Sequence, residues 1–190
     1  MALPDVRVIG IDPGSRTTGW GVVERVAGRL VAVASGVIRT RPEDPMPARL
    51  QAIHLGLVAV FAAHLPGEAA MEEIFSHKSA TSALVLGQAR GVALLATCGV
   101  PLVTYNAMTI KKSVSGSGKA DKDQVARMVR VLLGTEGTSV ADETDALAIA
   151  ITHLVHRRGV TLAPVTVKKE RRMSARDQWT AIALRAGVKA

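Results

Sequence analysis

Apolar and polar residues alternate in patterns that predict the first elements of the chain. A compact apolar run over Val6–Asp12, ended by Pro-Gly, is typical of a buried strand followed by a turn. Two β-rich segments follow, Gly19–Val26 and Leu30–Ile38, and the Ala-Gly-Arg between them predicts a hairpin. Apolar residues at helical spacing then predict a helix over Ala48–Leu65.

The second half of the chain alternates between strands and helices. After a Pro-Gly break, we expect a short strand over Glu68–Phe75, a long helix over Ser79–Thr97 and another short strand over Pro101–Tyr105. A loop with the sequence SGSGKA precedes two more predicted helices, Asp121–Leu133 and Ala141–Val155. Antiparallel strands followed by alternating helices and strands predict an α/β fold, with a mixed sheet and helices on both faces.

The composition and net charge of the chain indicate a globular domain with an anionic partner. The chain has 190 residues, of which 48% are hydrophobic and 21% charged, and this balance excludes wholesale disorder. A net charge of +8 favours nucleic acid as a partner over a membrane surface. Two Trp, two Phe and one Tyr are too few for a base-stacking platform, so nucleic-acid contacts must depend mainly on phosphates and shape.

Most of the positive charge lies at the end of the chain. Residues 1–156 hold 15 basic and 14 acidic side chains, whereas residues 157–190 hold nine basic and two acidic ones. We therefore expect a folded domain over residues 1–158 and a basic tail over residues 159–190. The tail is either a solvated, disordered extension or an accessory arm held near DNA by counterion release.

The single cysteine and the lengths of the apolar runs indicate where the protein works. Cys98 alone cannot form an intramolecular disulfide, and its apolar surroundings predict a small buried residue. The start of the chain does not resemble a signal peptide, and the apolar runs are too short, or too broken by His54 and His64, to span a bilayer. We expect a reducing, cytoplasmic setting without a membrane partner.

Carboxylates at element ends are the candidates for chemistry. Asp12 ends the first predicted strand, and Glu72 and Glu73 interrupt a later one, where at most one of them can share a face with Asp12. Asp142 and Asp145 are three residues apart at the start of a helix and project from one face. Each also has an ordinary structural explanation: a turn, a solvated strand end, or a favourable charge at a helix start.

Taken together, these acids favour a metal centre over the separate structural explanations. Clustered carboxylates repel one another and raise each other's pKa unless a cation neutralises them. Mg²⁺ and Mn²⁺ prefer oxygen ligands of this kind. Two such ions about 4 Å apart can activate water and stabilise the leaving oxygen of a phosphodiester.

Five sequence blocks, in order between about Arg7 and Arg158, resemble the RuvC Holliday-junction resolvases, the crossover junction endodeoxyribonucleases. The blocks are IGIDPGSRTTGWGVV, MEEIF, SALVLGQARGVA, IKKSVSGSG and DETDALAIAITH. The resemblance implies a ribonuclease H-like fold with a mixed five-stranded sheet flanked by helices on both faces. It also implies symmetric, metal-dependent hydrolysis of four-way DNA junctions in recombination and repair, leaving 5′-phosphate and 3′-hydroxyl ends.

The resemblance assigns roles to individual residues. It implies that two Mg²⁺ or Mn²⁺ ions are held by four acids: Asp12, Glu72, Asp142 and Asp145. Glu72 is chosen over Glu73 because the family's acid stands three residues before a Phe, here Phe75, which is associated with stacking on bases near the junction centre.

The family's functional lysines match Lys111 and Lys122 in this sequence. With Lys112 and Lys119 they also form a local cluster that favours phosphate binding without the resemblance; otherwise they are solvated surface lysines. We expect His153, like His77, to be structural or on the surface rather than catalytic.

The resemblance also implies a homodimer, because a four-way junction is cut on two symmetry-related strands. The implied interface involves the helix over Ser79–Thr97, whose small residues would let two helices approach, or would equally pack against the sheet. A branch-migration complex of the RuvA and RuvB type is a partner that the sequence leaves open. Two alternative functions are less favoured. An ATPase of the actin-like superfamily needs two domains of this kind, for which 190 residues leave no room. A junction-binding protein without catalytic activity does not need the four acids, which are all present.

Overall fold

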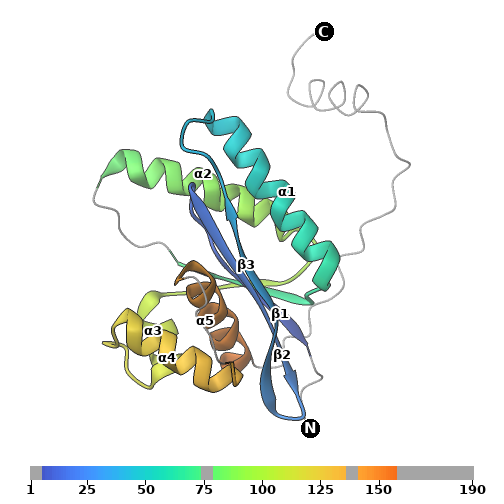
Figure 1. Ribbon diagram of the computed structural model, residues 1–190, viewed down its shortest axis with the longest axis vertical. Coiled ribbons are helices and arrows are strands. Elements are labelled where there is room, and N and C mark those ends of the chain that lie inside the picture. Colours follow the sequence, from blue (N-terminus) through green and yellow to red (C-terminus); the bar gives the residue numbers. More distant parts are fainter. Residues whose placement is uncertain (1–5, 74–78, 136–140, 158–190) are drawn as a thin grey trace.

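A mixed five-stranded sheet forms the centre of the computed structural model, which describes residues 6–73, 79–135 and 141–157 (Figure 1). The strands are β1 (Arg7–Asp12), β2 (Thr17–Val26), β3 (Arg29–Arg39), β4 (Glu68–Glu72) and β5 (Leu102–Tyr105). They lie in the order β3-β2-β1-β4-β5. The pairs β3–β2 and β2–β1 are antiparallel, whereas β1–β4 and β4–β5 are parallel, which confirms the predicted mixed sheet.

The helices are α1 (Met46–His64), α2 (Ala80–Ala96), α3 (Ala107–Ser115), α4 (Lys122–Leu133) and α5 (Ala141–His156). Four of them match the predicted helices to within a few residues. The sequence pattern assigned no element to α3. It begins at Asn106, whose side chain accepts a hydrogen bond from the Thr109 N–H at 2.8 Å, and it ends at Gly116 in the left-handed conformation, with φ at 79°.

The hairpin between β2 and β3 turns at two residues with positive φ, Ala27 at 50° and Gly28 at 81°. Two consecutive left-handed residues match the twist of antiparallel strands and make a tight two-residue connection. The predicted hairpin is therefore confirmed.

Successive residues of β1 point to opposite faces of the sheet, and each face is covered by helices. Ile9 and Ile11 pack with residues of α1 and α2, whereas Val8 packs with residues of α3, α4 and α5. Gly10 lies under α5, where a β-carbon would meet the carbonyl oxygen of Ala146. The absence of a side chain at this position lets α5 cross directly over β1 (Figure 1).

Two expectations about apolar segments are corrected. Cys98 is exposed, because α2 ends before it and leaves it on the connection to β5. By length and composition alone, α1 is long and apolar enough to cross a membrane, a test that core helices of soluble proteins also pass. Its residues Ile53 and Leu57 are fully buried against the sheet, whereas Leu55 and Val58 on its outer side are exposed.

Candidate active site

The sheet face covered by α5 carries Asp12 at the end of β1. Asp12 follows Val8 and Gly10 in the strand alternation, so its side chain leaves the sheet on the α5 side. Its neighbour in β2 is Gly19, where a β-carbon would meet the carbonyl oxygen of Asp142. A glycine at this point lets the start of α5 approach the end of β1.

Glu72 lies on the same face, and Glu73 follows it outside the strand. In β4, Glu68 is hydrogen-bonded to His153 of α5, and Ala70 is buried with α5 residues. Because alternate residues of a strand share a face, Glu72 points to the α5 face as well. Glu73 is exposed, and its backbone N–H donates to the Tyr105 carbonyl at 2.7 Å. The parallel pairing of β4 with β1 brings Glu72 to the same end of the sheet as Asp12.

Asp142 and Asp145 belong to the first turns of α5 and are both partly buried. Burial of Asp12, and then the negative charges of Asp145, Glu72 and Asp142, raise the pKa of the Asp12 carboxyl from 3.8 to about 7. Burial and the charge of Asp145 also raise the pKa of Glu72. The structure therefore brings carboxylates of β1, β4 and α5 into electrostatic contact.

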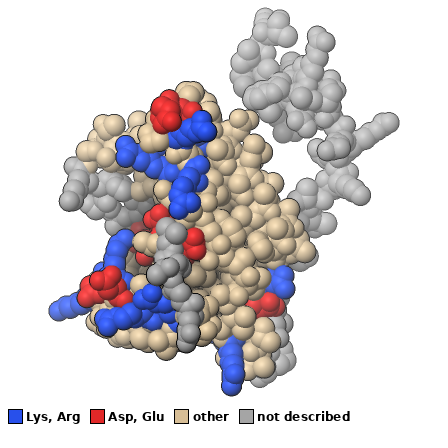
Figure 2. All heavy atoms as spheres, in the orientation of Figure 1, with Lys and Arg blue, Asp and Glu red and all other residues tan. Residues whose placement is uncertain are grey.

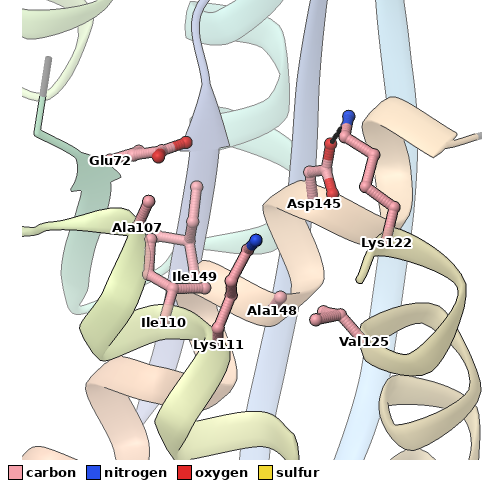
Figure 3. Close-up of a pocket in the computed structure, with 9 residues that line it drawn as sticks. All are labelled: Glu72, Ala107, Ile110, Lys111, Lys122, Val125, Asp145, Ala148 and Ile149. Carbon is pink, nitrogen blue, oxygen red and sulfur yellow. Dashed lines mark hydrogen bonds and ion pairs between the residues drawn. The ribbon is translucent and has the colours of Figure 1, made fainter. Parts of the chain in front are cut away.

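Lysines of α3 and α4 face these acids. The Lys122 Nζ lies 3.2 Å from the Asp145 Oδ2, and this carboxylate raises the pKa of the lysine. Lys122 and Lys111 both act to lower the pKa of Glu72, against the effect of its burial. Figure 3 shows Glu72, Lys111 and Asp145 pointing into one space from β4, α3 and α5.

The space between these side chains is a pocket of about 140 Å³ with a largely apolar floor. Its floor is formed by residues of α3, α4 and α5: Ala107, Ile110, Val125, Ala148 and Ile149. Because an apolar floor excludes water from one side of the acids, it strengthens their interactions with one another and with any cation.

The donor set has the chemistry of a site for hard divalent cations. Carboxylate oxygens predominate, and both the burial of Asp12 and its repulsion by the other acids, which together raise its pKa, are costs that a bound cation would offset. Within the residues that the structure describes, no group of three or more His, Cys, Asp or Glu side chains is arranged to hold a metal ion as it stands. Asp145 pairs with Lys122, whose positive charge offsets part of the negative charge of the acids.

Some predicted site residues lie apart from the acids or outside the described part of the chain. Lys112 and Lys119 are exposed, on α3 and on the loop before α4. Phe75, His77 and the tail from residue 159 onward lie outside the described residues.

His153 is structural, as expected. Its Nε2 lies 2.7 Å from Glu68 Oε2, and its Nδ1 lies 2.9 Å from the Tyr105 hydroxyl. Arg157 Nε donates to Glu68 Oε1 at 2.9 Å. This buried network ties α5, which carries Asp145, to β5 and to β4, which carries Glu72. It therefore fixes the position of α5 relative to β4.

Sequence reasoning missed this network and one further contact, the donation of an Arg90 guanidinium N–H to the backbone carbonyl of Glu72. Arg90 belongs to α2, on the opposite face of the sheet from α5. No local sequence pattern indicates either contact, because the partners are between 18 and 89 residues apart in the chain.

Comparisons with known proteins agree with this geometry. The family model described as Crossover junction endodeoxyribonuclease RuvC matches residues 8–153. A crossover junction endodeoxyribonuclease RuvC of Bradyrhizobium diazoefficiens is 48% identical over 159 residues, which cover 83% of this chain and 91% of the relative. Another, of Saccharophagus degradans, is 50% identical over 149 residues and covers 77% and 86%.

Solved structures of the same kind are similar in fold. T. thermophilus RuvC in complex with Holliday junction substrate has a TM-score of 0.75 and 36% identity, and the match covers 79% of this chain and 93% of that one. The yeast mitochondrial Holliday junction resolvase Ydc2, at 16% identity and a TM-score of 0.58, shares the fold. By its sequence match and its structure, the chain belongs to the RuvC family of crossover junction endodeoxyribonucleases.

Proposed function

We propose that this protein is an endonuclease that resolves four-way DNA junctions by metal-dependent phosphodiester hydrolysis. One observation carries the proposal: acids from β1, β4 and α5 meet at one end of the sheet, where burial of Asp12, and then the charges of Asp145, Glu72 and Asp142, raise the pKa of Asp12 to about 7. Membership of the RuvC family, and the junction substrate bound to the T. thermophilus relative, support DNA junctions as the substrate.

The acids proposed to hold two Mg²⁺ or Mn²⁺ ions are Asp12, Glu72, Asp142 and Asp145. When bound, such ions activate water and stabilise the charge that develops on the departing 3′ oxygen, which leaves a 5′-phosphate and a 3′-hydroxyl. Asp12 is central because it interacts electrostatically with the other three acids. Lys122, whose Nζ lies 3.2 Å from the Asp145 Oδ2, is proposed to place its positive charge beside the scissile phosphate.

Lysines are proposed to bind the DNA backbone around the cut. Lys111 lines the pocket beside the acids and, with Lys122, faces the space that a scissile phosphate would occupy. Lys112 and Lys119 are exposed and extend this positive surface along α3 and the next loop. Phe75, outside the described residues, is proposed to stack on a base at the junction centre.

We further propose a cytoplasmic homodimer that acts in recombination and repair. Residues 1–158 form the nuclease domain, and residues 159–190 form a basic tail that adds affinity for DNA. Cutting of two symmetry-related strands requires two active sites, and the dimer interface is proposed to involve α2, where Leu84 and Leu95 are exposed. A branch-migration complex of the RuvA and RuvB type is proposed as a partner.

A synthetic four-way junction and a linear duplex of matched sequence test the function directly. We expect paired, symmetric cuts in the junction with Mg²⁺ or Mn²⁺, no cuts in EDTA, and no cuts in the duplex. Asp12→Asn and Asp145→Asn should abolish cutting while junction binding remains. Cleavage by these variants at the wild-type rate would contradict the metal site, and equal cutting of the duplex would contradict the substrate.

A further inference from the structure

Arg39 ends β3 on the same face of the sheet as the acids. It pairs with Thr17 of β2, two residues from Gly19, which faces α5. Paired residues of adjacent strands point to the same side, and the intervening Ile38 packs with α1 residues on the other side. The Arg39 side chain therefore leaves the sheet on the α5 side.

The register also sets the separation of Arg39 from Asp12. Asp12 pairs with Gly19, and Gly19 pairs with Val37, two residues before Arg39. Two strand spacings of about 4.8 Å and two residues of about 3.3 Å place the two Cα atoms roughly 12 Å apart. That distance equals the axial rise of about four nucleotides of one DNA strand.

Two more arginines lie beside Arg39. The Thr40 N–H donates to the Arg16 carbonyl at 3.0 Å, which joins the loop after β1 to the end of β3, and Arg41 follows directly. All three arginines are exposed. Among the residues that the structure describes, none of the three forms an ion pair.

The acids are thus flanked by positive charge on two sides. Figure 2 shows Lys and Arg side chains near the end of β3 and the start of α1, at the top, where acidic side chains lie beside them, and over α3 and α4, at the lower left, with further acidic side chains between the two groups. Glu143 of α5 also lies on this face, where its Oε2 accepts a hydrogen bond from the Ser35 hydroxyl at 3.2 Å. A DNA strand that crosses an acidic centre is repelled there and needs cations on both sides of it.

We propose that Arg39, flanked by Arg16 and Arg41, binds backbone phosphates of the cleaved DNA strand on the side of the acids opposite the lysines of α3 and α4. The proposal rests on the proposed function, because it assumes a DNA substrate. It assigns this surface the task of holding one junction arm, and it sets the contacted phosphate within about four nucleotides of the cut.

The first test measures junction binding in EDTA over a salt titration, so that no strand is cut. Loss of one phosphate contact in Arg39→Gln should reduce the slope of log K against log[salt] by about 0.9. Affinity at fixed salt should fall about tenfold, as expected for a charge-assisted hydrogen bond. Arg29→Gln is the matched control: it changes an exposed arginine at the other end of the same strand, about 33 Å away, and should bind with the wild-type slope.

The second test locates the contact with junctions that carry a neutral methylphosphonate at single positions near the cut. Wild type should lose affinity at several positions near the cut, and Arg39→Gln should lose nothing further at one of them, within about four nucleotides of the cut. Equal losses in both proteins at every position, or a wild-type salt slope in Arg39→Gln, would overturn the inference. If wild type itself neither binds nor cuts the junction, the proposed function has failed instead.

Discussion

Asp12 should destabilise the metal-free fold whenever its carboxyl is ionised. Burial, and then the charges of Asp145, Glu72 and Asp142, raise its pKa from 3.8 to about 7, so the folded protein binds a proton here more tightly than the unfolded chain does. Stability is therefore lost as the pH rises from about 4 to 7. With about 1.36 kcal/mol for each pH unit between the two pKa values, the full loss above pH 7 is roughly 4 kcal/mol.

Asp12→Asn removes this charge and keeps the size of the side chain. In EDTA at pH 8, the free energy of unfolding of the variant should exceed that of wild type by up to roughly 4 kcal/mol, and the difference should vanish near pH 4. Urea unfolding at pH 8, 6 and 4 measures it. Glu73→Gln is the control, because Glu73 is exposed and its neutralisation should have little effect at any of these pH values.

Addition of Mg²⁺ should favour the stability of wild type over that of Asp12→Asn. A cation that binds the folded state stabilises it, so wild type should gain stability at pH 8 while Asp12→Asn gains much less. The reasoning is refuted if metal-free Asp12→Asn is no more stable than wild type at pH 8, or if its advantage is the same at pH 4.

Three other substitutions test the site. Glu72→Gln should slow junction cutting at least about 100-fold, as loss of a group that stabilises the transition state does, whereas Glu73→Gln should cut within about twofold of wild type; equal rates would refute the assignment of faces. Lys122→Gln should slow cutting about 10- to 100-fold while Mg²⁺ still raises the melting temperature, and a lost metal response would show that the lysine organises the metal site instead. Gly19→Ala should lower the melting temperature and cutting together, because its β-carbon would collide with the carbonyl of Asp142; a variant with wild-type stability would contradict the close approach of α5 to β2.

Local patterns predicted the elements that have strong internal signals. The hairpin follows from the β-rich segments around Gly28, and α5 follows from an apolar run with acidic residues at its start. The helix α3 was missed because its nine residues are short for a periodic signal, and its cap at Asn106 is recognisable only once the helix is known. Cys98 was misjudged because apolar neighbours do not reveal where a helix ends.

The sequence by itself determined the family, the succession of the five strands and of four helices along the chain, and the residue types of the active site. It also showed that at most one of Glu72 and Glu73 can share a face with Asp12, since neighbouring strand residues point to opposite faces. Tertiary structure decided what depends on contacts between distant segments. The pairing of β4 with β1 and its packing under α5 direct Glu72 to the face of Asp12. The crossing of α5 over Gly10 and Gly19 buries Asp12 beside Asp142 and Asp145 and so raises the pKa of Asp12, and the register of β3 brings Arg39 to the same side. Such contacts depend on register and packing, which no local pattern of residues encodes.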